Sequence, residues 1–323
     1  MPFASVTDLP PRPIDYLWPG RLARGHLHLV DGDPGIGKSL VLLDLAARLT
    51  SGRSLPDGAA AVAPTPAILF NAEDNARDTV APRLAAAGAD LGRVSLWEHA
   101  PGEPGFRLPS LAGLLAEELR RTGAGLVVLD PILAFLDPAV NIANDPSVRQ
   151  ALAPLVELAA AFRCAIVLLR HLNKDPGGPA LYRGLASIAF VAACRIAWLM
   201  GPDPKVPRQY VLAQVKNNLE PPQPSLAYRI TGAAGSGPRV DWLGVSSWDE
   251  ADVLRGAPTR RRARLRAADF LTAALKDGPR PAREVLAAAR REGLSPDTLR
   301  RAFEEAGVQR QRLRPFQKGQ VTY

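Results

Sequence analysis

The chain has 323 residues, of which 47% are hydrophobic and 22% charged, enough for a large α/β core and a smaller second unit. Its only cysteines, Cys164 and Cys194, lie in apolar stretches, which excludes a disulfide framework and a cysteine-based metal site. The sequence has no uncharged apolar run of the roughly 18 residues that a membrane span needs, and it begins without a basic leader. These features predict a cytoplasmic protein with no membrane partner.

The net charge of +8 is unevenly distributed along the chain. Residues 258–323 hold 16 Lys and Arg against 7 Asp and Glu, and subtraction from the totals of 40 and 32 leaves 24 against 25 for residues 1–257. All the excess positive charge therefore lies at the C-terminal end. A basic run is usually a solvated tail, but the helical periodicity of this segment favours a folded unit.

Residues 32–39, GDPGIGKS, form a complete phosphate-loop motif between an apolar run at 26–30 and a helical pattern at 40–49. The glycines let backbone N–H groups point at phosphate oxygens, and the following helix adds the positive end of its dipole. Lys38 is placed to reach the β- and γ-phosphates and Ser39 to ligate Mg²⁺. A chance glycine turn is the alternative, and the flanking strand and helix argue against it. We expect ATP and Mg²⁺ as cofactors, with nucleotide contacts from Asp33, Pro34, Gly35, Ile36, Gly37, Lys38, Ser39 and Leu40.

Further apolar runs alternate with helical patterns after the phosphate loop. Short buried strands are expected at 67–70, 126–130 and 165–169, with helices at 111–122 and 148–162. Such alternation predicts an α/β fold with a mostly parallel, covered sheet. Four later runs have little helix between them and predict antiparallel strands at 196–200, 210–216, 226–230 and 240–243.

Three polar side chains follow the predicted strands. Asp130 ends an apolar strand about one crossover unit beyond the phosphate loop, where a carboxylate would hold Mg²⁺ through water. Glu73 follows the second strand and is placed to polarise the attacking water, although the acidic segment around it also suits a helix N-cap. His171 follows the 165–170 strand and is placed to sense the γ-phosphate, although a lone histidine is more often structural.

The last 62 residues carry a second periodic pattern. Leu265, Ala268, Leu271 and Leu275 fall at helical spacing, and a second helix is expected from 281 to 289. Ser295 and Pro296 cap a third helix that stops by Gly307, and the alternating segments of 308–323 suit a β-hairpin. Three helices and a hairpin predict a winged helix-turn-helix. The expected organisation is an N-terminal arm at 1–24, an ATPase domain at 25–245, a linker at 246–261 and a winged-helix DNA-binding domain at 262–323.

A winged helix of this charge suits duplex DNA. Its third helix would present polar side chains to a major groove and its wing would add cations, giving salt-dependent affinity. The alternative is a protein-docking winged helix with a solvated basic face. The expected duplex contacts are Thr298, Arg300, Arg301, Arg312, Arg314 and Lys318.

Together these motifs resemble RecA-like P-loop ATPases of the RepA and DnaB hexameric helicase type, over about residues 17–243. The resemblance implies that Glu73 acts on the hydrolytic water, that His171 is the polar sensor and that Arg195, downstream of Arg183, reaches the nucleotide of a neighbouring subunit. It also implies that Lys216 assists in the neighbour's site. Loops at 141–147 and 174–182 would line a central channel, with Lys174 contacting single-stranded DNA.

The sequence departs from the family pattern at two places. Asn218 stands where the DnaB pattern has an arginine, and Leu185 and Ala186 replace small polar residues after the Arg-Gly segment. The prediction is a Mg²⁺-dependent ATPase that forms a hexameric ring and serves as a replicative helicase or DNA motor of a plasmid, phage or mobile element, with a primase or replication initiator as a partner.

Two alternatives remain. One is an ATP-controlled DNA-binding switch or helicase/primase loader without processive unwinding, favoured by the few basic residues in the channel loops. The other is a KaiC-like signalling ATPase, which the basic C-terminal segment argues against.

Overall fold

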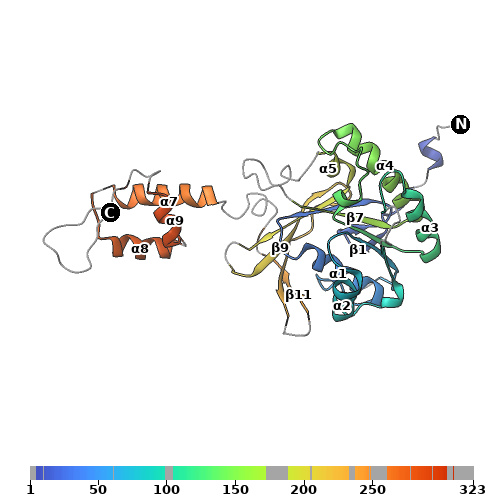
Figure 1. Ribbon diagram of the computed structural model, residues 1–323, viewed down its shortest axis with the longest axis horizontal. Coiled ribbons are helices and arrows are strands. Elements are labelled where there is room, and N and C mark those ends of the chain that lie inside the picture. The colour runs from blue at the N-terminus through green and yellow to red at the C-terminus, as the bar shows by residue number, and fades with distance from the viewer. Residues whose placement is uncertain are drawn as a thin grey trace. The chain divides into compact units, whose positions relative to one another are not determined.

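The computed structural model describes residues 5–9, 11–60, 62–98, 105–171, 188–203, 206–232, 237–246, 248, 260–276, 278–292, 294–303 and 308. The chain forms two compact units, Met1–Arg255 and Gly256–Tyr323 (Figure 1). The division falls inside the segment expected to be a linker. Arg183 and the expected DNA contacts Lys174, Arg312, Arg314 and Lys318 lie outside the described residues.

A nine-stranded sheet forms the centre of the first unit, in the order β11-β10-β9-β8-β3-β7-β6-β4-β5. Six of its strands are parallel: β3 (Leu27–Gly32), β4 (Ala67–Asn71), β5 (Val94–Leu96), β6 (Leu126–Asp130), β7 (Ala165–His171) and β8 (Ile196–Pro202). Three antiparallel strands extend it: β9 (Gln209–Asn217), β10 (Leu226–Thr231) and β11 (Arg239–Val245). The predicted α/β fold with a mostly parallel sheet is confirmed.

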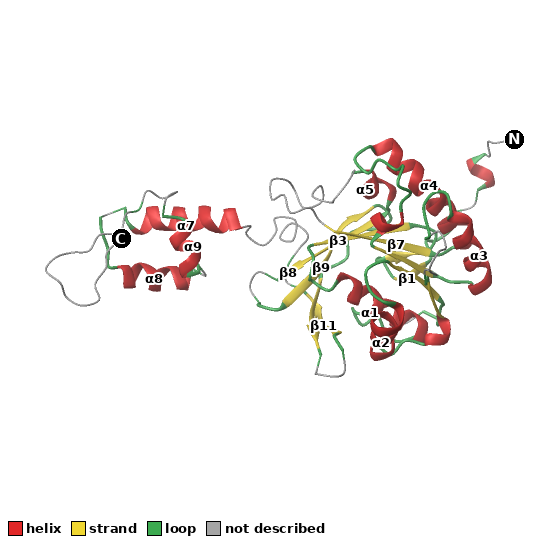
Figure 2. Cartoon of the chain, viewed as in Figure 1, coloured by secondary structure: helices red, strands yellow, loops and turns green. Residues whose placement is uncertain are grey.

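Helices cover both faces of this sheet (Figure 2). One face packs against α1 (Lys38–Ser51) and α2 (Ala81–Ala86), and the other against α3 (Ala112–Thr122), α4 (Asp145–Phe162) and α5 (Ala189–Ala193). Alternate residues of β6 enter opposite cores, which explains its unbroken apolar run. Short turns of helix occur at η1 (Val6–Asp8), η2 (Ala76–Val80), η3 (Leu91–Arg93) and η4 (Ile132–Phe135).

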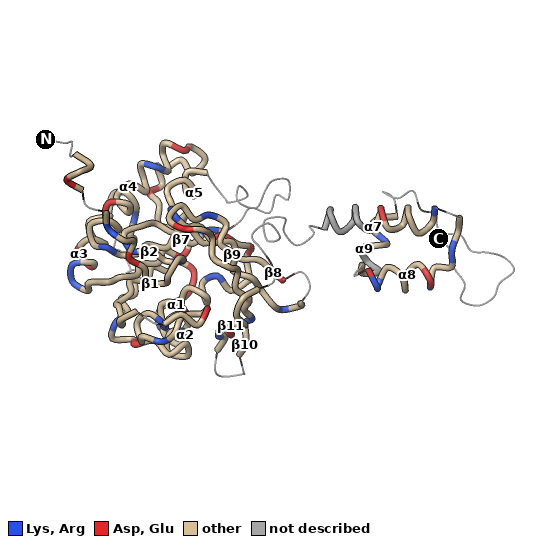
Figure 3. The backbone as a smooth tube through the Cα atoms, turned by 180° about the vertical axis from the view of Figure 1, so that it is seen from behind, with Lys and Arg blue, Asp and Glu red and all other residues tan. Residues whose placement is uncertain are grey.

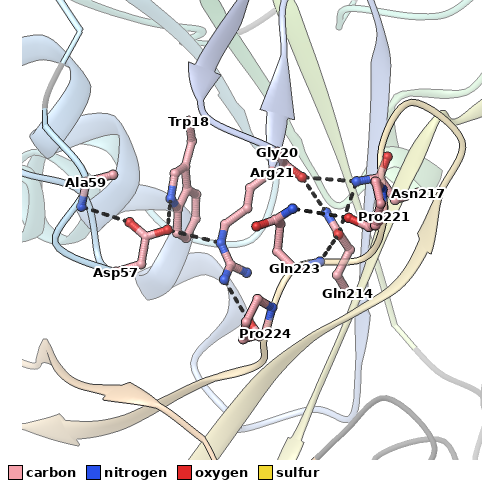
Figure 4. A network of polar contacts seen from close by, with 10 residues as sticks. All are labelled: Trp18, Gly20, Arg21, Asp57, Ala59, Gln214, Asn217, Pro221, Gln223 and Pro224. Carbon is pink, nitrogen blue, oxygen red and sulfur yellow. Dashed lines mark hydrogen bonds and ion pairs between the residues drawn. The ribbon is translucent and has the colours of Figure 1, made fainter.

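A small hairpin of β1 (Tyr16–Trp18) and β2 (Leu22–Ala23) belongs to the core of the first unit. Trp18 Nε1 and Arg21 Nε both donate to Asp57 Oδ2, at 2.9 and 3.2 Å (Figure 4). The Gly20 carbonyl accepts hydrogen bonds from Gln214 and Asn217 of β9. Residues 16–23 are therefore not a separate arm, because apolar burial and these long-range hydrogen bonds join them to the sheet.

The described residues of the second unit form three helices, α7 (Arg260–Ala274), α8 (Ala282–Arg291) and α9 (Pro296–Arg301). Leu271, Val285 and Leu299, one from each helix, share a small buried core. Three helices thus occur in the region that was predicted to form a winged helix, with α7 starting within the expected linker. The wing expected at 308–323 lies outside the described residues except for Val308.

None of the helices in the described part of the chain is both long and apolar enough to cross a membrane.

Candidate nucleotide site

The phosphate-loop motif connects the end of β3 at Gly32 to the start of α1 at Lys38. Gly35 and Gly37 have φ angles of 80° and 81°, a region that favours glycine. A Cβ at Gly37 would also lie 2.5 Å from Ile230 Cδ1, so this position cannot accept a side chain without movement. Within the loop, Ile36 is buried, whereas Asp33, Pro34 and Gly35 are exposed. The outer surface of the loop is therefore open to a ligand.

Lys38 is buried at the start of α1, and its Nζ donates to the Asp33 carbonyl at 2.8 Å. Burial lowers the pKa of Lys38, and neighbouring carboxylates, Asp130 first among them, oppose this shift. The ammonium is thus held over the loop and close to an acidic cluster.

Asp130 ends β6 and is 5% exposed. Burial raises the pKa of Asp130 to about 6, while a hydrogen bond from Ser39 opposes this shift. Folding therefore brings the two expected metal-binding residues together. Among the described residues there is no group of three or more His, Cys, Asp or Glu that could hold a metal by itself. A hydroxyl beside a buried carboxylate fits Mg²⁺ that is shared with phosphate oxygens and water, the usual manner of Mg²⁺ binding.

Glu73 and His171 lie at the same edge of the sheet as the phosphate loop. His171 Nε2 is 3.4 Å from Glu73 Oε1, and the His171 position pairs with Gly32 across β7 and β3. His171 Nδ1 is buried without a hydrogen-bond partner among the described residues. The side chain of Asn75 accepts hydrogen bonds from two backbone N–H groups and is the N-cap of η2. Glu73 itself therefore does not cap this turn of helix.

A buried ion pair that no sequence motif predicts lies beneath this edge. Arg170 Nε and Nη2 donate to the two carboxylate oxygens of Asp31, at 2.9 and 2.7 Å. The Arg170 guanidinium also lies 5.4 Å from the ring centroid of Phe190 in α5. Asp31 directly precedes Gly32, and Arg170 directly precedes His171, so each apolar strand carries one charged residue near its end. This pattern is the sequence signal that could have identified the pair.

Similarity to known proteins identifies the family of this chain. Residues 2–177 match a family model described as an AAA domain, which covers just over half of the chain. The chain belongs to the AAA domain family. It is therefore a P-loop ATPase. No curated protein sequence matches it. A crystal structure of the RadB recombinase is similar at 18% identity and a TM-score of 0.46, covering 65% of this chain and 89% of that chain.

Two expected catalytic residues of this AAA-family ATPase lie at the opposite edge of the sheet. Arg195 is exposed before β8 and its N–H donates to the Leu27 carbonyl at the start of β3, about 16 Å from the end of that strand. Lys216 Nζ donates to the Val191 and Cys194 carbonyls at the end of α5, both at 2.7 Å. Within one subunit, neither side chain belongs to the nucleotide site.

The expected DNA contacts of the AAA-family chain are described only at α9. Thr298 Oγ1 is 2.8 Å from Ser295 Oγ, and the Thr298 backbone N–H donates to the same Ser295 oxygen. It therefore completes the N-cap of α9. Arg300 is exposed on this helix, and the side chain of Arg301 lies outside the description.

Proposed function

We propose that this AAA-family ATPase hydrolyses ATP with Mg²⁺ and acts on DNA as a ring-forming motor, a replicative helicase of a plasmid, phage or mobile element. The observation that carries the proposal is the separation of Arg195 from the phosphate loop. Arginines described near the loop edge are ion-paired, Arg170 with Asp31 and Arg83 with Asp74. Arg195 makes no ion pair among the described residues and lies at the far edge. A subunit would then need its neighbour's arginine to stabilise the transferred phosphoryl group.

The residues of the loop edge divide the chemical work. Lys38 and the loop N–H groups bind the phosphates, while Ser39 and Asp130 would hold Mg²⁺, which neutralises phosphate charge when bound. Glu73 orients the attacking water and accepts its proton. His171 holds the Glu73 carboxylate through its Nε2 contact, and therefore positions it.

The distribution of charge supports a role on DNA. The first unit carries both signs interspersed along its backbone (Figure 3), whereas residues 258–323 carry a net of +9. The three helices of the second unit, with Arg300 on α9, suit a winged helix that binds duplex DNA. Single-stranded DNA would pass through the hexameric ring, and a primase or replication initiator would be recruited beside it.

One observation favours a second candidate, an ATP-controlled DNA-binding switch or helicase/primase loader. The channel segment 141–147 contains no Lys or Arg, and segment 174–182 contains only Lys174. A motor that pulls a single strand is expected to contact its phosphates with more cations. Strand displacement of a forked duplex separates the candidates, because the switch would bind DNA and hydrolyse ATP without unwinding.

A subunit-mixing experiment tests the shared site. Glu73→Gln subunits keep Arg195, and Arg195→Ala subunits keep Glu73, so each variant alone should assemble but hydrolyse little ATP. In an equimolar random ring, a site is active when its own Glu73 and its neighbour's Arg195 are both intact, which predicts recovery to about a quarter of wild-type turnover.

Arg149 is exposed on α4, and Arg149→Ala is the matched control. This variant by itself should keep full ATPase activity. Full turnover by Arg195→Ala alone would rule out the arginine's role. If both variants are inactive and mixing them restores no ATP turnover, the result would contradict an active site that a neighbouring subunit completes.

A further inference from the structure

The hairpin of β10 and β11 contacts the phosphate loop and α1 through two aromatic side chains. The buried Tyr228 hydroxyl donates to the Ile36 carbonyl at 2.8 Å. Trp242 Nε1 donates to Asp44 Oδ2 in α1, also at 2.8 Å. The Tyr228 ring is stacked on Tyr210 at 5.4 Å and lies 5.6 Å from the Trp242 ring. The hairpin therefore contacts both the loop and the helix that follows it.

The direction of the Tyr228 hydrogen bond is determined by chemistry. Burial raises the pKa of Tyr228 far above neutral, so the hydroxyl stays protonated. The Ile36 carbonyl can only accept, so the phenol is the donor. Because both groups are buried, removal of the hydroxyl would leave the carbonyl without this donor in a site with little access to water.

The loop has few other contacts that define its shape. Asp33, Pro34 and Gly35 are exposed, and a Cβ at Gly35 would meet nothing within 4 Å. On the inner side, Ile230 Cδ1 stands against Gly37, next to the Ile36 carbonyl held by Tyr228. The hairpin thus holds two adjacent loop residues from within, while the outer surface stays open to phosphate.

We propose that Tyr228 is a positioning residue that keeps the phosphate loop in its nucleotide-binding conformation. This inference rests on the proposed nucleotide site at Lys38. Without the hydroxyl, the loop populates additional conformations, and the apparent Kd for ATP rises by the inverse of the fraction that can bind. The removal of one neutral hydrogen bond corresponds to about a two- to tenfold rise in Kd.

The test compares Tyr228→Phe with Tyr210→Phe, which removes the same atom from the neighbouring ring. Tyr210 makes no side-chain hydrogen bond to the described residues. Calorimetric titration with a slowly hydrolysed ATP analogue and Mg²⁺ should give a Kd raised about two- to tenfold for Tyr228→Phe only. KM should rise in parallel, whereas kcat at saturating ATP should match that of Tyr210→Phe.

Ile230→Val, which deletes the methyl group that faces Gly37, is a second variant and should raise Kd in the same direction. Equal Kd values for both tyrosine variants would overturn the proposal, and so would a lower Tm of Tyr228→Phe without a change in Kd. Lys38→Ala separates this failure from failure of the site itself. Loss of binding of the ATP analogue by this variant would show that the titration measures binding at the phosphate loop. Undiminished binding would show that the nucleotide binds elsewhere.

Discussion

Replacing Arg170 with methionine should destabilise the first unit by about 3–5 kcal/mol, because Asp31 would stay buried without its partner. The two side chains are 1% and 4% exposed, and both carboxylate oxygens of Asp31 accept from the guanidinium. The same substitution removes the contact of the guanidinium with Phe190. The cost should exceed that of an exposed ion pair, since water cannot replace the missing donors.

Tryptophan fluorescence can measure this destabilisation in the first unit alone. All five tryptophans precede residue 256, so urea unfolding followed by their emission does not include the C-terminal helices. A double variant, Asp31→Leu with Arg170→Met, provides the comparison. It leaves no uncompensated carboxylate in the core and should recover most of the stability that Arg170→Met loses.

Two results would refute this reasoning. A cost below about 1 kcal/mol for Arg170→Met would mean that the pair behaves like an exposed ion pair. Equal instability of the single and double variants would mean that packing, and not the buried charge, determines the destabilisation.

Two further predictions concern acid stability and DNA. Burial lowers the pKa of His28 to about 4 and the nearby His26 adds to this shift, whereas the hydrogen bond from Nε2 to the Ala23 carbonyl opposes it. The unfolded pKa is near 6.5, so this contribution to stability is present above pH 6.5 and decreases as the pH falls toward 4, by about 3 kcal/mol. Urea unfolding of His28→Gln, which keeps a donor but does not titrate, should lack this decrease, and parallel pH profiles would contradict it. Changing Arg300 and Arg301 to Ala should weaken duplex binding by the second unit and reduce the slope of log affinity against log salt by about one for each phosphate that is no longer neutralised. Unchanged affinity in a fluorescence-anisotropy titration would instead indicate a protein-docking role.

Local sequence was sufficient for the elements that are determined by local chemistry. The phosphate loop was predictable because glycines, a lysine and a serine occur at fixed spacing between a strand and a helix. The parallel strands were predictable because they are buried on both faces and read as unbroken apolar runs. β5 was missed because it has only three residues, all half-buried. The β1–β2 hairpin was missed because its short apolar runs are interrupted by Pro19 and Gly20.

The sequence by itself determined a phosphate loop, a mostly parallel α/β core and a basic helical end, since these depend on residue spacing and composition. Only the tertiary structure decided which distant side chains meet, because strand order places β7 beside β3 and β10 in contact with the loop. Arg170 thereby reaches Asp31 across 139 residues, and Tyr228 reaches Ile36 across 192. The fold also brings the Lys216 ammonium to carbonyls at the end of α5. Burial there favours hydrogen bonds to the carbonyls that have no partner within the helix.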